Sequence, residues 1–496
     1  MKTSFPTEQR WEQQEKHMGR WRSVTVVVVS MAIFLDALDV SIVNVALPAI
    51  KLDLHLTTAD LPWVQGAYLL TYAGLMLLGG RAADLLGRRR IFLLGSTLFG
   101  LGSLSGGLAT SVWLLIVARG VQGIGAALTA PSAVSILTTT FAEGPERNKA
   151  LGVFSATGGV GFTFGLVLGG VLTNFISWHW VFFVNVPVVL LILLLAPIVV
   201  PESRSMGGMR SYDLAGVVTV TGGLLLLVYA ITQANEGDAT LEKTAGLVAL
   251  ALFILVCFII IEWRSKAPLM PLRIFRSSTL SASSAVLFTL LGSFFSFLLI
   301  YTLYLQEVLH SSPLMASLPL LPGSILTIPI TQFVAPWLMN RLGVRRSLVL
   351  GMVCLFCGIA LFLRSGASAD YVGIILPSTI LCQISMGICI PTLSIAAVIG
   401  IEQTEQGLAA GLQGTVGQAG GGLMLAITAA VVAVSTGSRQ CCARPSAPSV
   451  VAQLSGLHAG LLVLAGGAAL GALIAAAFIQ KQSATDSRSG RQPLSL

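Results

Sequence analysis

The sequence has little charge. Of its 496 residues only 10% are Asp, Glu, Lys or Arg, whereas 55% are apolar. Soluble domains carry about 25% charged residues, so this composition excludes an ordinary soluble protein. Because lipid offers the backbone no hydrogen bonds, a chain of this kind must cross the membrane as helices that bond within themselves. The composition therefore predicts an all-α integral membrane protein surrounded by the lipid bilayer.

The sequence also lacks the motifs of common catalytic centres. It has no HExxH pattern, no phosphate-binding loop with its lysine and no cluster of Cys and His, and its five histidines are scattered. Cys354 and Cys357 form a CxxC pair inside an apolar run, where a thiol behaves as a small hydrophobic group. Cys441 and Cys442 are adjacent in a late loop and support no assignment. We therefore expect a protein that is not an enzyme, holds no metal or cofactor and depends on an ion gradient for energy.

The net charge of +8 would favour an acidic partner for a soluble protein. Here we expect topogenic charge on cytoplasmic loops and no nucleic-acid partner. Apolar runs of about 20 residues predict spanning helices, roughly at 23–50, 59–80, 91–109, 112–137, 149–173, 180–200, 213–233, 245–262, 281–306, 314–339, 346–365, 371–399, 407–435 and 457–479. With a cytoplasmic N-terminus, 23 of the 29 Lys and Arg face the cytoplasm, five face outward and one, Arg119, lies within a helix. This distribution favours fourteen helices in the plasma membrane with both termini cytoplasmic.

A short internal repeat indicates how the helices are grouped. DLLGRRR, from Asp84 to Arg90, and NRLGVRR, from Asn340 to Arg346, are 256 residues apart and follow expected helices 2 and 10. Two six-helix halves would place the copies six helices apart, so two extra helices lie between them. Parallel halves around a central site are typical of transporters. The predicted divisions are a cytoplasmic tail at 1–22, a six-helix bundle at 23–200, two inserted helices at 201–276, a second six-helix bundle at 277–480 and a cytoplasmic tail at 481–496.

The loop GRAADLLGRRR, from Gly80 to Arg90, follows the second expected helix. Gly80 and Gly87 would permit a tight turn, and Asp84 could face the positive end of a neighbouring helix. The spacing Gly-x3-Asp-x2-Gly-Arg-Arg resembles the most widespread signature of the major facilitator superfamily, with Leu85 where that family usually has a basic residue. The resemblance implies a conformational switch formed by Gly80, Asp84, Gly87, Arg88 and Arg89.

A glycine stripe follows in GFTFGLVLGG, where Gly161, Gly165 and Gly169 are spaced by four. Such a stripe lets another helix approach closely. It resembles the antiporter motif of the superfamily, in which a Gly-Pro pair kinks the helix. Leu166 replaces that proline, so close packing is implied while a hinge is not. Ordinary packing of small residues explains the stripe equally well.

Two further segments narrow the resemblance. LDVSIVNVALP, from Leu38 to Pro48, and SWHWVFFVNVP, from Ser177 to Pro187, closely resemble the fourteen-helix drug:proton antiporters of the superfamily, with His179 where that family usually has Arg. The resemblance runs from about residue 25 to 430. It implies the major facilitator fold with two extra central helices, working as a monomer that exports amphipathic drugs or natural products by alternating access.

The first expected helix carries two acids, Asp36 and Asp39. A charge at the bilayer centre costs about 2.5–3.5 kcal/mol on insertion scales, and three residues of separation place both acids on one side of the helix. Arg119 in LIVARGVQGIGAA lies at a depth similar to Asp39, so the geometry predicts a pair between them, and Gln122 shares the face of Arg119. This segment resembles a superfamily motif tied to proton transfer, in which Asp39 matches the family's acid and Asp36 does not. An Arg119 that only reaches outward to water, or an Asp36 that only forms a local hydrogen bond, stays possible.

These residues suggest a mechanism. Two such close carboxylates should not both stay ionised in a medium of low dielectric constant, so one of them can carry the driving proton or hold a cationic drug. The resemblance implies that Asp39, with Arg119, is the proton-coupling residue, and that Asp36 tunes the affinity for the proton or the charge preference of the pocket. The polar residues expected to contact the substrate are Asp36, Asn44, Gln65, Tyr68, Gln122, Tyr304 and Gln306, although each could instead link helices. Two alternatives stay open: a proton-coupled symporter that takes up a small metabolite, and a membrane-embedded sensor or enzyme.

Overall fold

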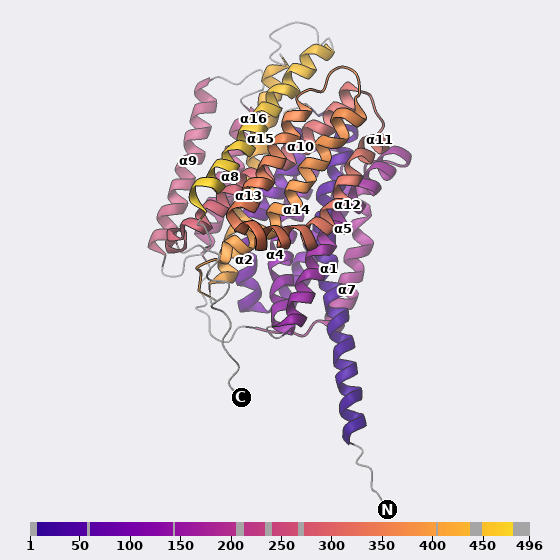
Figure 1. Cartoon of the computed structure of the whole chain (residues 1–496), viewed down its shortest axis with the longest axis vertical. Coiled ribbons are helices and arrows are strands. Elements are labelled where there is room, and N and C mark those ends of the chain that lie inside the picture. The colour runs from indigo at the N-terminus through magenta and orange to yellow at the C-terminus, as the bar shows by residue number, and fades with distance from the viewer. Residues whose placement is uncertain are drawn as a thin grey trace, which may run out of the picture.

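The computed structural model describes residues 7–56, 60–141, 144–204, 213–233, 241–265, 272–402, 405–436 and 449–479. Every regular element in these ranges is a helix. Cys441, Cys442 and the predicted tail at 481–496 lie outside the described residues. Figure 1 shows the helices side by side in one bundle, with the start of α1 projecting well beyond it.

The first half contains seven helices. They are α1 (Thr7–Asp53), α2 (Leu61–Leu86), α3 (Arg88–Gly107), α4 (Val112–Thr140), α5 (Pro145–Phe175), α6 (Trp180–Phe183) and α7 (Asn185–Val199). Helix α1 packs along α5, and α4 packs along both α2 and α3. Helix α7 packs against α3 and α1. Helix α1, which carries the two acids, also contacts α4, α2 and α6, so other helices of the first half enclose it.

Two helices separate the halves in the sequence, α8 (Leu214–Gln233) and α9 (Leu241–Arg264). They pack against each other, and α8 also contacts α2 and α15. Figure 1 shows α9 at the edge of the bundle. Between its charged ends, α9 exposes several large apolar side chains, with Phe253 64% and Trp263 77% exposed, as suits a lipid-facing helix.

The second half is more segmented. It contains η1 (Leu272–Arg276), α10 (Ser278–Leu303), η2 (Tyr304–Val308), α11 (Pro313–Ser317), η3 (Leu318–Leu320), α12 (Leu321–Pro329), η4 (Ile330–Val334), α13 (Ala335–Phe362), η5 (Tyr371–Ile375), α14 (Leu376–Val398), α15 (Gln406–Ser435) and α16 (Val450–Phe478). Helix α10 packs against α15, α16 and α14, and α13 packs along α14 and α16.

Twelve helices in the described part of the chain are long and apolar enough to cross a membrane. One of them, Pro313–Phe362, has 50 residues, or about 75 Å at helical rise, more than twice the thickness of the hydrocarbon core. Its path breaks at Gly343, where φ is 79° and ψ is 166°. Helix α3 has 20 residues but is not among the twelve. Dividing the long segment and including α3 would give fourteen, which stays the predicted number.

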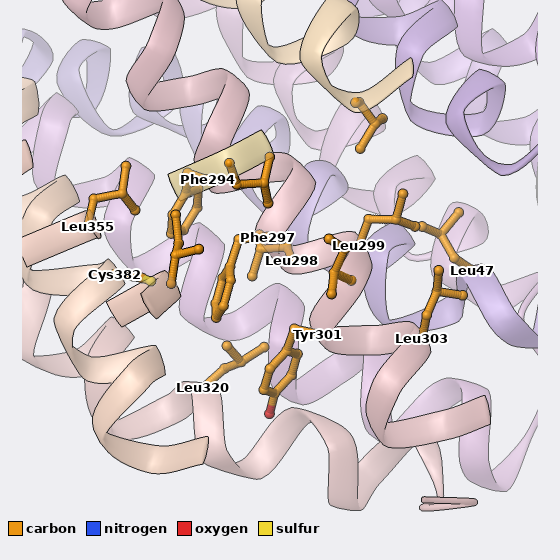
Figure 2. Close-up of a cluster of buried hydrophobic side chains, with 14 of the residues drawn as sticks. Leu47, Phe294, Phe297, Leu298, Leu299, Tyr301, Leu303, Leu320, Leu355 and Cys382 are labelled. Atoms are coloured by element: carbon orange, nitrogen blue, oxygen red, sulfur yellow. The ribbon is translucent and has the colours of Figure 1, made fainter. Parts of the chain in front are cut away.

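The largest buried cluster joins the two halves around α10. Figure 2 shows Phe294 and Phe297 of α10 on the side of Cys382 of α14, and Leu299 and Leu303 of α10 on the side of Leu47 of α1. Cys382 is 1% exposed, so its thiol packs as a small apolar group. Because lipid tails are as apolar as these side chains, close packing rather than water exclusion holds such helices together.

Candidate functional site

A buried ion pair links α1 to α4. Arg119 Nη1 donates a hydrogen bond to Asp39 Oδ2, and both side chains are 0% exposed. Arg119 also donates from Nε to the Val64 carbonyl at 2.7 Å and from Nη1 to Gln122 Oε1 at 2.9 Å. The geometric prediction that Asp39 pairs with Arg119 is confirmed, and an Arg119 that only reaches outward to water is excluded.

Asp39 has two further partners. Its Oδ1 accepts from Gln122 Nε2 at 3.0 Å and from Asn185 Nδ2 at 3.1 Å. The Ser103 hydroxyl accepts from the same two amides, at 2.8 and 3.4 Å. Sequence reasoning identified Gln122 but missed Asn185 and Ser103. The signal for Asn185 was an amide inside the apolar run VFFVNVP, at the start of α7.

The network is not fully satisfied. Among the described residues, Arg119 Nη2 and Asn185 Oδ1 are buried without a hydrogen-bond partner. An unpaired buried donor or acceptor destabilises the conformation in which it occurs by about 1–3 kcal/mol. The site therefore has one spare donor and one spare acceptor that a rearrangement could use.

Asp36 lies beside this network in a different setting. Tyr68 donates its hydroxyl to Asp36 Oδ1, and Tyr72 donates to Oδ2 at 3.4 Å. No salt bridge to Asp36 occurs within the described residues. The Arg119 guanidinium lies 4.6 Å from the centre of the Tyr68 ring, a cation–π contact. Tyr68 thus touches Asp36 through its hydroxyl and Arg119 through its ring.

Tyr72 was missed by sequence reasoning, although its position one helical turn after Tyr68 could have revealed it. A small cavity of about 20 Å³ adjoins Asp36 and is also lined by Ser96 and Thr129. A cavity of about 10–15 Å³ can hold one water molecule when polar groups line it. Asp36 therefore adjoins a space large enough for one water molecule. The residues that line this space belong to α1, α3, α4 and α7 and not to α2, which carries Tyr68 and Tyr72.

Two of the other expected substrate contacts connect the halves of the protein. Asn44 Oδ1 accepts from the Thr302 hydroxyl at 2.8 Å. Gln306 Nε2 donates to the Val45 carbonyl at 3.0 Å. Nearby, Lys51 and Glu307 form a salt bridge of 2.7 Å. We call these three contacts the inter-half latch; they occupy the C-terminal end of α1 and the junction of α10 with η2.

The remaining two expected contacts do not join Asp36. Tyr304 donates its hydroxyl to the Gly366 carbonyl at 2.8 Å, and its ring packs edge-on against Phe362. Gln65 is 4% exposed on α2. Among the expected contacts, Tyr68 bonds Asp36 and Gln122 bonds Asp39.

The turn between α2 and α3 is made by Gly87 alone. Its φ is 117°, and a Cβ there would lie 2.6 Å from Glu202 Oε1. The prediction that Gly80 also forms the turn is wrong, because α2 stays helical to Leu86. A Cβ on Gly80 would meet only Pro131, at an ordinary 3.5 Å.

The charged residues of this loop bind the segment after α7. Arg88 pairs with Asp84 at 2.9 Å, and its backbone N–H donates to the Ser203 carbonyl at 3.1 Å. Arg89 donates to the carbonyls of Pro197 and Val200, each at 3.2 Å. Glu202, which sequence reasoning missed, lies 3.7 Å from Arg89 and 3.6 Å from Arg90.

The internal repeat has a glycine of positive φ at the same position in both copies. Gly343, 256 residues after Gly87, also has a positive φ, of 79°. Arg345 of this copy donates to the Ala476 carbonyl of α16. Each half thus has a left-handed glycine that ends one helix and begins the next.

The glycine stripe of α5 packs on the helix with the two acids. A Cβ on Gly161 would lie 2.4 Å from the Phe34 carbonyl, and one on Gly165 would lie 2.0 Å from Ser41 Oγ. A Cβ on Gly169 would lie 2.9 Å from the Ile42 carbonyl. The prediction of close helix approach is confirmed. Helix α5 is continuous through Leu166 from Pro145 to Phe175.

Comparisons with known proteins agree with this architecture. Residues 29–425 match the family described as the Major Facilitator Superfamily. The chain is 37% identical to the cephamycin export protein CmcT of Amycolatopsis lactamdurans over 84% of this chain and 86% of that protein. It is 35% identical to the puromycin resistance protein pur8 of Streptomyces alboniger, over 84% and 82% of the two chains. It is 33% identical to the tetracenomycin C resistance and export protein of Streptomyces glaucescens, over 83% and 76%.

Solved structures show the same fold at low sequence identity. A POT family transporter in complex with a thioalcohol-conjugated peptide superposes with a TM-score of 0.64 at 13% identity, covering 90% of this chain and 94% of that one. An inward-facing bacterial homologue of the human lysosomal transporter Spinster gives a TM-score of 0.62 at 16% identity, with coverage of 96% and 99%. The chain therefore belongs to the Major Facilitator Superfamily.

Proposed function

We propose that this protein is a proton-coupled antiporter that exports amphipathic drugs or natural products through the plasma membrane. Relatives that match more than four fifths of the chain have names that refer to antibiotic export or resistance, which supports export. Both termini are cytoplasmic in this proposal, and the protein works as a monomer without a bound cofactor.

The observation that carries the proposal is the difference between the two acids. Asp39 is held by a buried arginine and two amides, whereas Asp36 is bonded only by tyrosine hydroxyls among the interactions of the described residues. Protonating Asp39 would leave Arg119 as an uncompensated buried charge, at a cost of about 3–5 kcal/mol. Protonating Asp36 breaks no ion pair. Asp36 is therefore the acid that can exchange a proton while the ion pair stays intact.

Tyr68 provides a route from one acid to the other. We propose that the proton binds Asp36 at Oδ1, the oxygen that accepts from Tyr68. Because this oxygen then becomes a hydrogen-bond donor, the Tyr68 hydroxyl turns away or accepts instead of donating. Because the Tyr68 ring lies on the Arg119 guanidinium, its movement changes the surroundings of the ion pair. We propose that this step connects the protonation of Asp36 to a rearrangement of the side chains around the Asp39–Arg119 pair, which itself stays formed.

Competition for Asp36 then gives exchange. The ionised carboxylate attracts a cationic or hydrogen-bonding substrate, and the incoming proton displaces it. Each proton that enters the cell gains about 2.3 kcal/mol per 100 mV of membrane potential. One carboxyl that holds either a proton or a substrate is sufficient for obligatory exchange.

The inter-half latch supports alternating access. Its three contacts hold α1 against α10 and η2 at the C-terminal end of α1, which the proposed orientation places at the outer surface. We propose that the structure represents the state closed to the outside, and that the latch opens when the substrate leaves.

Transport in inverted vesicles tests this function. Respiration makes the interior of such vesicles acidic, so an antiporter should accumulate ethidium or puromycin inside them, and a protonophore should abolish the accumulation. A symporter that imports its substrate would instead drive no accumulation under this gradient, and that result would reject the proposed direction. A resistance profile of cells with and without the protein would identify the substrates.

A further inference from the structure

A second, larger cavity lies away from the acids. Its volume is about 600 Å³, and it is formed by α10, α15 and α16. Small-molecule sites commonly enclose about 300–1,000 Å³. Its lining is mostly apolar and includes Phe288, Met424 and Leu470, with the hydroxyls of Ser281, Ser284 and Thr289.

This cavity is not part of the interface between the halves. On α15, Gly414 faces α2, since a Cβ there would lie 2.8 Å from Met76 Cε. Val416, which lines the cavity, is two residues later and so projects from the opposite side of α15. The cavity therefore lies on the outer side of the second half, behind the helix that contacts α2.

The cavity opens toward the hydrocarbon. Gly466 and Leu470, one turn apart on α16, both line it, and Leu470 is 51% exposed. A Cβ on Gly466 would meet nothing within 4 Å. Ser284 lies six residues after Ser278, where α10 begins. It is therefore about 9 Å along the helix axis from that end. In the proposed orientation this is the cytoplasmic half of the bilayer.

One polar group in the cavity lacks a partner. The Ser281 hydroxyl donates to the Phe275 carbonyl at 2.8 Å, and the Thr289 hydroxyl donates to the Val286 carbonyl at 3.0 Å. Within the part of the chain that the structure describes, the Ser284 hydroxyl is buried without a hydrogen-bond partner, and Ser284 is only 2% exposed. A lipid acyl chain has no group at this depth that could satisfy it. An amphipathic molecule with a donor or acceptor on an apolar body could.

We infer that this cavity is a binding site for amphipathic small molecules dissolved in the cytoplasmic leaflet, with Ser284 as the group that bonds their polar atom. It is separate from the acid site and extends the proposed export function without depending on it. A molecule bound here is held at the protein while it is still in the membrane.

Photolabelling with benzophenone tests the site, because this probe partitions into lipid and combines two apolar rings with one carbonyl acceptor. The full chain in nanodiscs is irradiated with increasing probe and the labelled positions are mapped by mass spectrometry. We expect saturable labelling of Met424 and neighbouring cavity residues. Gly466→Leu should reduce it at least fivefold, while Gly246→Leu, at an exposed α9 glycine with nothing within 4 Å of its Cβ position, should not.

The serines give a matched pair of variants. Losing one hydrogen bond weakens binding about three- to tenfold, so Ser284→Ala should raise the benzophenone concentration that gives half-maximal labelling by that factor. Ser281→Ala should leave it unchanged, because that hydroxyl already has a partner. Labelling that rises linearly and equally in every variant would mean that acyl chains alone fill the cavity, and would overturn the inference. Saturable labelling with the same half-saturating probe concentration in Ser284→Ala as in the wild type would also overturn it.

The outcome is independent of transport. Labelling in nanodiscs needs neither a gradient nor transport, so it is measured independently of export. If export fails its test while this labelling pattern holds, the site stands; if labelling fails while export holds, only the site is rejected.

Discussion

Replacing Asp39 by asparagine removes the negative charge that faces Arg119 while keeping the size of the side chain. Both members of this pair are 0% exposed, so solvent cannot compensate for the loss. Leaving one charge of a buried pair unpaired costs about 3–5 kcal/mol. A cost of 3 kcal/mol is roughly a 150-fold change in an equilibrium constant. We therefore expect Asp39→Asn to destabilise the protein strongly and to abolish proton-driven export.

A double-mutant cycle separates the ion pair from other effects. Arg119→Met should also be costly, because it leaves Asp39 charged with only two amide donors. The double variant has neither charge, so its cost should fall well below the sum of the single costs. Arg119→Lys keeps the charge and should spare part of the transport activity.

Unfolding in mixed micelles with increasing sodium dodecyl sulfate measures these free energies. The exposed pair Arg273–Glu405, in which the arginine side chain is 72% exposed, provides a control cycle with an expected coupling of at most about 1 kcal/mol. Costs at Asp39 and Arg119 that simply add would refute the reasoning, because the two side chains would then contribute independently.

Three further predictions follow from close contacts and the latch. Gly87→Ala should reduce transport severely because φ is 117° and the new Cβ would meet Glu202, whereas Gly80→Ala should be close to wild type; equal activities in a vesicle assay would contradict the assignment of the turn. Gly165→Leu should force α5 away from α1, because even a Cβ would lie 2.0 Å from Ser41, and folded yield in detergent should drop sharply; wild-type yield would be inconsistent with this packing. Lys51→Ala should shift the protein toward the outward-open state, seen as increased labelling by an impermeant reagent of a cysteine placed near the latch, with stability changed by no more than about 1 kcal/mol; unchanged labelling would exclude a gating role for the Lys51–Glu307 pair.

The contacts that could be predicted from the sequence were those determined by how deep a residue lies in the membrane and by the spacing of residues along one helix. Asp39 and Arg119 lie at similar depths on helices that run in opposite directions, so their pairing followed from counting residues. Gln122 followed from its position one turn after Arg119. The glycine stripe of α5 followed from its spacing of four, which does not depend on a partner's identity.

The contacts that were missed depend on how separate helices rotate toward one another. Asn185 bonds Asp39, and Ser103 bonds Asn185 and Gln122, only because α7 and α3 both turn polar side chains toward this network, and no local pattern encodes that rotation. Glu202 reaches Arg89 across more than one hundred residues of chain. Gly80 was misassigned because a glycine near a helix end is equally compatible with continuing the helix, and here α2 continues to Leu86.

The central claim is that Asp36 exchanges a proton for a substrate while the Asp39–Arg119 pair stays formed. Proteoliposomes that contain a pH-sensitive dye test it directly when an outward substrate gradient is imposed without any other driving force. We predict that in the wild type the protons move in the direction opposite to the substrate. We also predict that Asp36→Asn, which keeps an acceptor for Tyr68, folds normally but moves no protons. Proton movement of wild-type size in Asp36→Asn would contradict the account.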